Sequence, residues 1–127
     1  MRQTVGVLTD AGAHAVCVIL DVPQLNHPGS HALIIAQRRG IPDDFLAVTR
    51  AEALAPTQRM EGEVRALSLA GVLRFADPKS VLCPGLTCLY KAAGRSLYFD
   101  RDHLSSAGAA YIAKTLETCF NPPNDAP

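Results

Sequence analysis

An unbroken apolar run, AVCVIL at residues 15–20, decides how this chain is expected to fold. The run has the length of one strand, and it ends at Asp21-Val22-Pro23. Because apolar and polar residues do not alternate in it, it predicts a strand covered on both faces, as in a parallel sheet. A second strand is predicted at residues 72–77, before Pro78. With a helix between them, the two form a βαβ unit, whose strands are parallel and whose crossover is right-handed.

The helix between these strands has a start and a stop signal. Thr49 and Glu52 have the spacing of a capping box, in which each side chain binds the other residue's backbone N–H. Gly71 follows the last residue of the apolar stripe and is placed to end the helix. Pro56 interrupts the pattern, so the main helix is expected to begin close to it and to cover about residues 57–70.

The rest of the chain predicts shorter elements around this unit and a single domain over residues 1–120. A terminal tail of residues 121–127 contains three prolines and is expected to be disordered. The remaining expectations are a helix within 2–13, a long loop over 23–49 with a short helix near 32–37, a hairpin of 89–91 with 96–99, and a final helix capped by Ser105 or Ser106.

Charge and hydropathy exclude some classes of partner. The 127 residues carry 12 basic and 12 acidic side chains, so the formal net charge is zero. Binding to nucleic acid therefore has no electrostatic support. No segment reaches the roughly 20 apolar residues of a membrane span, and the first 20 residues do not form a good export signal.

The four cysteines suggest one disulfide. Pro84-Gly85 bends the chain between Cys83 and Cys88, which can bring their side chains within bonding range. Cys17 and Cys119 are expected to be separate buried or half-buried thiols. No second close Cys or His pair completes a zinc site, so no metal is predicted. A disulfide implies an oxidising compartment.

Asp100 and His103 carry the chemistry that the sequence suggests. They lie three residues apart on a loop before the final helix. In a catalytic triad an aspartate accepts from histidine Nδ1, so that Nε2 can take a proton from a serine. The alternative is an exposed acidic turn. Asp102 is expected to be a solvated carboxylate, and the other histidines (His14, His27 and His31) are expected in loops or at helix ends.

The residues around this pair carry a resemblance. The stretch YFDRDHLSSAGA at residues 98–109 resembles the last motif of SGNH hydrolases, and in particular the SGNH domain fused to acyltransferase-3 membrane proteins that O-acetylate surface polysaccharides. Residues 22–23, 75–78 and 83–88 agree in order and spacing, so the resemblance covers about residues 12–119.

The resemblance implies a fold and an activity. The fold would be α/β, a partial three-layer, flavodoxin-like parallel sheet with flanking helices and a small hairpin. Asp100 would orient His103, the general base, in an esterase or O-acyltransferase that acts on acylated carbohydrate without a cofactor. An upstream membrane acyltransferase domain would be the partner, and the outer face of the cytoplasmic membrane the location.

The other half of the expected active site is missing. The family's nucleophile lies in a Gly-Asp-Ser motif, and none of the chain's six serines follows Gly-Asp. Asn26, the one asparagine before the tail, does not match the oxyanion-hole motif. The chain is therefore predicted to be a C-terminal portion of the domain, either truncated upstream or a remnant, and inactive alone.

Two further hypotheses stay open from the sequence. One is a non-catalytic α/β remnant or accessory module that packs against a partner. The other, which has less support, is a metal-binding module that uses Asp100, Asp102 and His103.

Overall fold

The computed structural model describes residues 1–120 of the chain. Its helices and strands, in chain order, are α1 (Arg2–Asp10), β1 (Cys17–Ile19), α2 (Gly29–Arg39), the 3-10 turn η1 (Asp44–Leu46), α3 (Arg50–Leu54), α4 (Gln58–Leu69), β2 (Arg74–Ala76), α5 (Lys79–Leu82), β3 (Lys91–Ala92), β4 (Arg95–Ser96) and α6 (Ser106–Phe120). The predicted disorder of the tail lies outside the described residues. Within residues 1–120, no helix is both long and apolar enough to cross a membrane.

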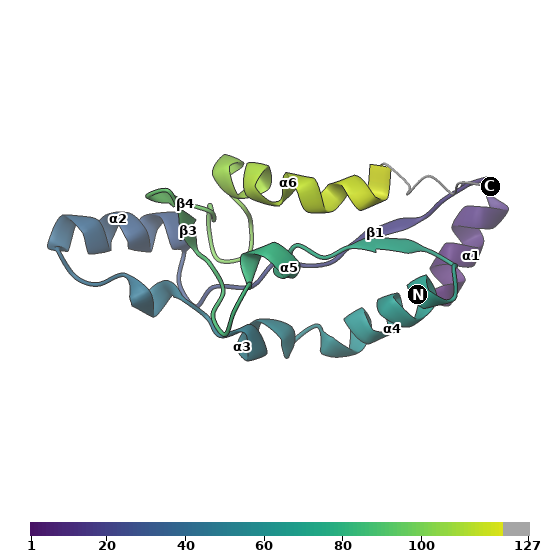
Figure 1. Ribbon diagram of the computed structural model, residues 1–127, viewed down its shortest axis with the longest axis horizontal. Helices are drawn as coiled ribbons and strands as arrows, with labels where there is room; N and C mark the ends of the chain where they lie inside the picture. Colours follow the sequence, from purple (N-terminus) through teal and green to yellow (C-terminus); the bar gives the residue numbers. More distant parts are fainter. Residues whose placement is uncertain (121–127) are drawn as a thin grey trace.

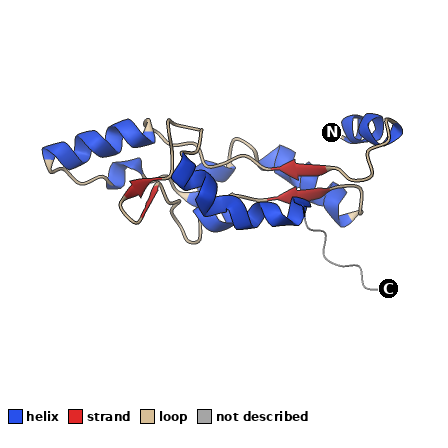
Figure 2. Cartoon of the chain, turned by 90° about the horizontal axis from the view of Figure 1, so that it is seen from above, coloured by secondary structure: helices blue, strands red, loops and turns tan. Residues whose placement is uncertain are grey.

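The predicted βαβ unit is confirmed. Strands β1 and β2 pair in parallel, with Cys17 beside Arg74, Val18 beside Phe75 and Ile19 beside Ala76. In Figure 1, α4 lies along one side of this pair and α6 along the other. Figure 2 shows the pair well separated from the β3–β4 hairpin.

The sheet is smaller than the expected three-layer SGNH sheet. Among the described residues the parallel sheet has two strands of three residues each, so the full sheet is not confirmed. The local pattern of residues 15–20 and 72–77 predicts strands but holds no information on how many neighbours each strand has. What the structure contains is a two-stranded parallel sheet between helices, together with an antiparallel hairpin.

The crossover between β1 and β2 follows its sequence signals closely. The Thr49 hydroxyl accepts from the Glu52 amide at 3.1 Å, and the Glu52 carboxylate accepts from the Thr49 amide at 2.8 Å, which confirms the capping box. The capped helix is the short α3, and α4 begins two residues after Pro56, at Gln58. The proline thus divides the segment into two helices, because it cannot take a place in a helix interior.

The long loop contains more helix than expected. Helix α2 covers Gly29–Arg39, and Gly40 ends it in the left-handed conformation with φ of 62°. It begins one residue after Pro28, a residue whose fixed φ suits a helix start. His31 therefore lies within α2 and not in a loop, whereas His27 precedes the helix and packs edge-on against Phe45.

Two apolar clusters hold the chain together. The first joins α1 and α4 to the strands and contains Val5, Leu20, Val64, Leu67 and Leu73. The second lies under α6 and the hairpin and includes Leu25, Leu82, Leu97, Tyr98 and Ile112.

A buried ion pair connects the ends of the two strands. Lys79, only 2 % exposed, donates to the Glu61 carboxylate at 2.9 Å and also to the backbone carbonyl of Asp21. Burial of a lysine is tolerated only when the charge is paired and hydrogen-bonded, as it is here. The contact fixes the segment after β1 against the segment after β2.

The structure joins all four cysteines in disulfides. Cys83 bonds to Cys88, with Cα atoms 4.0 Å apart, and Cys17 bonds to Cys119, with Cα atoms 5.5 Å apart. The prediction that Cys17 and Cys119 are separate thiols is wrong. They are 102 residues apart in the sequence, and only the packing of α6 against β1 brings them together.

The two disulfides differ in the length of chain that they close, and this predicts different contributions to stability. From loop entropy, a loop of about 100 residues gives about 4 to 5 kcal/mol and a five-residue loop about 2 kcal/mol. The double variant Cys17→Ser/Cys119→Ser is therefore expected to lose roughly twice as much free energy of unfolding as Cys83→Ser/Cys88→Ser. Urea unfolding followed by circular dichroism measures both; equal losses would contradict the expectation.

Candidate functional site

A short loop between the hairpin and α6 carries the predicted site residues. Tyr98 and Leu104 form an antiparallel bridge across its base, and the Phe99 amide donates to the His103 carbonyl at 2.9 Å. Gly108 lies in the first turns of α6 against the Leu97 carbonyl, where a Cβ atom would come within 1.9 Å of that oxygen. The hairpin and the helix thus meet closely on both sides of the loop and limit its conformations.

The segment before α2 fixes the same loop from outside. The Leu25 amide donates to the Arg101 carbonyl at 2.7 Å, and Arg101 Nε donates back to the Leu25 carbonyl at 3.2 Å. The Gly29 amide donates to the Asp100 carbonyl at 3.0 Å. The sequence gives no sign of these contacts, because the partners are more than 70 residues apart. They hold the backbone of Asp100 and Arg101 in place.

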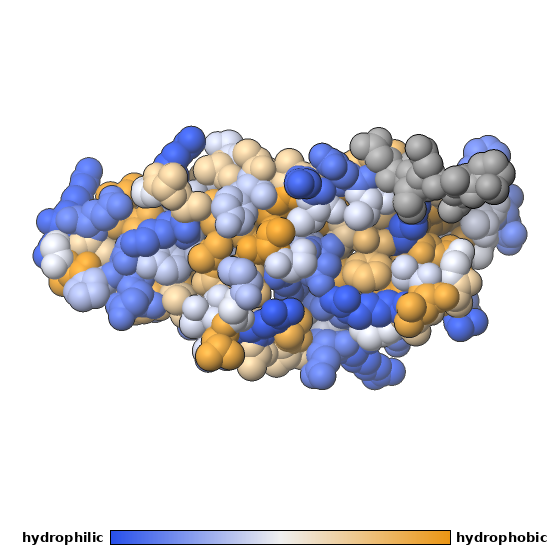
Figure 3. Space-filling view, in the orientation of Figure 1, coloured by the Kyte–Doolittle hydropathy of each residue, from blue (hydrophilic) through white to orange (hydrophobic). Residues whose placement is uncertain are grey.

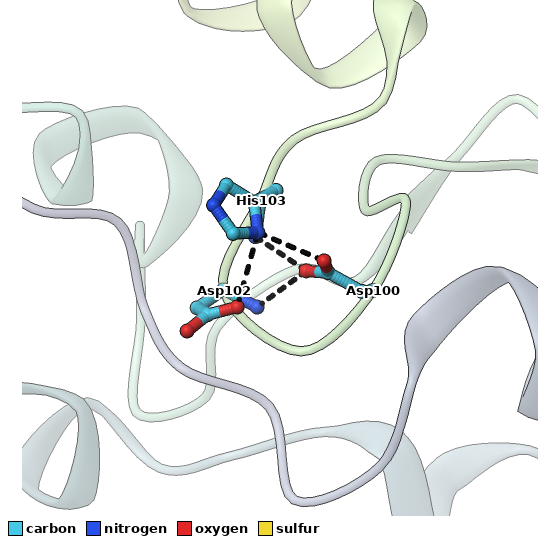
Figure 4. A group of neighbouring side chains, drawn as sticks. All are labelled: Asp100, Asp102 and His103. Carbon is cyan, nitrogen blue, oxygen red and sulfur yellow. Dashed lines mark hydrogen bonds and ion pairs between the residues drawn. The ribbon is translucent and has the colours of Figure 1, made fainter.

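Asp100 is the centre of the loop's hydrogen bonds. One carboxylate oxygen accepts from the Asp102 amide at 3.0 Å and the His103 amide at 2.8 Å, and the other lies 2.8 Å from His103 Nδ1 (Figure 4). The two backbone donors, and then the histidine, hold the pKa of Asp100 well below its usual range. The carboxylate is therefore ionised at neutral pH and fixed toward Nδ1.

Asp102 lies closer to the histidine than the sequence suggests. Its Oδ1 atom is 3.2 Å from His103 Nδ1, although the side chain is 54 % exposed. Asp102 is thus solvated, as expected, but its carboxylate also contacts the histidine, which was not expected. The Asp100 carboxylate, by its hydrogen bond and charge, and the Asp102 charge in addition raise the pKa of His103.

The other ring nitrogen of His103 is available. Nδ1 faces both carboxylates, whereas the far side of the ring points away from them (Figure 4). The side chain is 75 % exposed, and within residues 1–120 nothing hydrogen-bonds Nε2. The ring lines an open hollow together with residues 19–22 at the end of β1. The loop thus places a histidine ring, bonded to carboxylates on one side only, beside that hollow.

No serine of residues 1–120 is hydrogen-bonded to His103. Ser105 caps α6, since its hydroxyl accepts from the Gly108 amide at 3.2 Å and donates to the Ser96 carbonyl at 2.7 Å. Ser30, which falls in the segment expected to be a loop, lies in α2 and donates to the Phe99 carbonyl at 2.6 Å. That expectation is wrong, because residues 29–39 form a helix whose first turn packs against this loop.

The side chains of Asp100, Asp102 and His103 offer oxygen and nitrogen atoms within 4.8 Å of one another, a spacing that a metal ion can bridge. However, the Asp100 carboxylate already accepts three hydrogen bonds, one of them from His103 Nδ1, the ring nitrogen that faces both carboxylates. The donor set is thus arranged as a carboxylate–histidine pair.

The carboxylates make a measurable difference to the ionisation of His103. Because both negative charges favour the imidazolium, the His103 pKa is expected above that of an exposed histidine, and Asp100→Asn should lower it more than Asp102→Asn. An NMR titration of the His103 ring protons measures this pKa in the unchanged protein and in both variants. A larger effect of Asp102→Asn would show that the orienting role of Asp100 is misassigned.

Comparison with known proteins identifies the family of the chain. A family model described as "SGNH domain (fused to AT3 domains)" matches residues 1–118. No curated protein and no solved structure matches the chain. The match spans almost the whole chain and includes the loop that holds Asp100 and His103. The chain therefore belongs to the family of SGNH domains that are fused to AT3 domains.

Proposed function

We propose that residues 1–120 are the C-terminal portion of an SGNH-type esterase or O-acyltransferase domain and supply the aspartate and histidine of its Ser-His-Asp triad. The observation that carries the proposal is the 2.8 Å contact between Asp100 Oδ2 and His103 Nδ1, in a histidine whose far ring edge points away from the carboxylates and which lines an open hollow. This is the relation between acid and base that a serine nucleophile requires.

In this reaction His103 first acts as a general base. Nε2 takes the serine proton while the serine oxygen bonds to the acyl carbonyl carbon, and it then returns that proton to the departing alkoxide. In the second step Nε2 takes a proton from water in an esterase, or from a sugar hydroxyl in a transferase, as that oxygen bonds to the acyl carbon. The bond from the acyl carbon to the serine oxygen then breaks, and Nε2 returns the proton to the serine. Asp100 stays ionised throughout, and it holds the tautomer and stabilises the imidazolium.

The serine and the oxyanion donors come from polypeptide other than residues 1–120 in this proposal. Two observations support an external serine. Ser30 and Ser105 are hydrogen-bonded to backbone carbonyls, and the sequence contains no Gly-Asp-Ser motif. A base accelerates nothing without a hydroxyl within reach and donors for the developing oxyanion. The 127-residue chain alone is then inactive.

The family supports a proposal for the substrate and the location. We infer an acyl ester, acetyl above all, of cell-surface carbohydrate, with a membrane acyltransferase domain as the partner. Two disulfides support an oxidising environment, which for such a partner is the extracytoplasmic face of the membrane.

Within residues 1–120 no serine is hydrogen-bonded to His103, and this observation also favours a second candidate, a non-catalytic accessory module. Such a module would keep the fold for packing on a partner and would not need His103 as a base. The two candidates differ in whether replacing His103 changes the reactivity of any serine in the assembled protein.

The purified chain is expected to give no fluorophosphonate labelling and no hydrolysis of p-nitrophenyl acetate above the His103→Ala control. Adding a segment that bears Gly-Asp-Ser is expected to produce labelling at that serine, which His103→Ala reduces by about a thousandfold or more. Labelling of the chain alone that disappears in His103→Ala would show that its own serines include the nucleophile. Labelling of the assembled protein that is indifferent to His103 would favour the accessory module.

A further inference from the structure

We infer that a cleft between α3, α4 and the segment after β2 binds a carboxylated sugar unit of the carbohydrate substrate. This inference rests on the proposed function, from which the ligand is taken to be carbohydrate, and it assigns a place to an acidic unit of that carbohydrate. It is carried by the lining of the cleft, by its balance of charges and by its position beside the hollow of His103.

The cleft has the size and the lining of a ligand site. Its volume is about 500 Å³, within the roughly 300–1,000 Å³ of small-molecule sites and more than a single small ion fills. Ala51, Ala55 and Gly62 give it small apolar surfaces, and Gln58 adds an amide. On the face seen in Figure 3, hydrophilic side chains gather over α4, at the lower middle of the view. Such a mixed wall suits a sugar ring, which has apolar faces and a polar edge.

The buried part of the cleft wall carries fixed charges. Glu61 and Lys79 are both buried and lie 2.9 Å apart, and the Thr57 hydroxyl donates to the same Glu61 oxygen at 2.6 Å. Burial alone would raise the pKa of Glu61, but the bonds from Thr57 and Lys79 and the charges of Lys79 and Arg65 hold this pKa below its usual value. The carboxylate is therefore ionised, and it neutralises Lys79.

The remaining charges of the cleft do not balance. Three cations and two carboxylates line it. Lys79 is paired with Glu61, and Arg65 Nη2 lies 2.5 Å from the Asp77 carboxylate. Arg50 is the third cation, and within residues 1–120 it forms no ion pair with a carboxylate. The cleft thus has one positive charge in excess, on a guanidinium at its wall.

Arg50 is held in place by groups outside the cleft. Its backbone N–H donates to the Leu86 carbonyl at 2.8 Å, and its Nη1 donates to the Cys83 carbonyl at 3.3 Å. A guanidinium has five N–H donors, so further donors remain for a ligand. Its planar fork matches a carboxylate, which accepts two parallel hydrogen bonds from it. One carboxylate also neutralises the single excess charge, whereas a phosphate monoester would bring a charge of about −2.

The position of the cleft connects it with the proposed reaction. Met60 and Pro78 line the hollow of His103, whereas their chain neighbours Glu61 and Lys79 line the cleft. The two hollows therefore lie on either side of the same two segments, beyond the carboxyl ends of the strands, where parallel α/β sheets form their sites. A carbohydrate chain that crosses these segments would have an acidic unit in the cleft and a neighbouring unit at the histidine.

A pair of matched sugars tests the inference on the 127-residue protein. Methyl glucuronide and methyl glucoside differ in having a carboxylate or a hydroxymethyl group, and each is titrated while the backbone amide signals are followed by NMR. We expect the glucuronide to shift the Ala55 and Gly62 signals saturably and to bind at least about tenfold more tightly than the glucoside, because charge-assisted hydrogen bonds are the stronger ones. Equal affinities, or no shift at these amides, would overturn the inference.

Substitutions separate the guanidinium of Arg50 from general charge attraction. Arg50→Gln should lower the affinity for glucuronide by about tenfold, and Arg50→Lys, which keeps the charge but not the fork, should lower it less. The matched control is Arg59→Gln, which removes the same charge from a side chain of α4 that is 96 % exposed and outside the cleft. An unchanged His103 titration shows that each variant is folded. Equal losses in Arg50→Gln and Arg59→Gln, or no loss in Arg50→Gln, would contradict a site at Arg50.

Inorganic phosphate as the only addition distinguishes a sugar site from a simple anion site. We expect phosphate to bind more weakly than the glucuronide, since it leaves the apolar wall uncovered. Phosphate that binds as tightly, and that Arg50→Gln displaces, would refute the sugar ligand.

The same titration in His103→Ala distinguishes failure of the cleft from failure of the proposed function. Glucuronide binding should be unchanged in this variant, because the two hollows are separate. If binding persists while serine labelling of the assembled protein is indifferent to His103→Ala, the cleft stands and the triad is refuted. If labelling depends on His103 but glucuronide does not bind, the triad stands and the cleft is refuted.

Discussion

The bond between Cys17 and Cys119 is the constraint on which the site geometry depends. Two three-residue strands share only a few backbone hydrogen bonds, which is little to hold a parallel sheet together. The disulfide ties β1 to the last turn of α6, and Gly108 near the first turn allows α6 to lie directly on the Leu97 carbonyl. The loop with His103 leads directly into α6. The packing of this helix against the sheet therefore also positions His103 beside the end of β1.

Within that frame the acid–base pair is almost independent of the rest of the chain. The carboxylate of Asp100 is positioned by two amides from its own loop, so the orientation toward Nδ1 forms as soon as the loop closes. The backbone hydrogen bonds from the Leu25 and Gly29 amides to the loop then fix the position of this pair in the fold. In the proposed triad, a pair that is already rigid would lower the entropy cost of bringing the nucleophile to the site.

The features that were predictable from sequence are those that local chemistry determines. The βαβ unit follows from apolar runs and chain handedness, the capping box from Thr49 and Glu52, and the hairpin from the turn at Gly94. The features that were missed are relations between distant residues: the bond of Cys17 to Cys119 and the hydrogen bond from Ser30 to the Phe99 carbonyl. The contact of Asp102 with His103 was missed for another reason, because the loop's backbone turn, which spacing does not reveal, brings this solvated carboxylate back to Nδ1.

The exposure of His103 links the ionisation of the base to completion of the site. In the described chain the ring is 75 % exposed, and the two carboxylates raise its pKa, which favours the protonated form that cannot accept a proton. Covering the ring with a further segment would remove water from the imidazolium, and desolvation lowers the pKa of a histidine. Covering the ring would thus oppose the effect of the carboxylates on the His103 pKa and favour the neutral imidazole. The fixed Asp100 carboxylate would still hold the proton on Nδ1. A solvated histidine becomes a catalytic base only when the serine, the oxyanion donors and the exclusion of water arrive together.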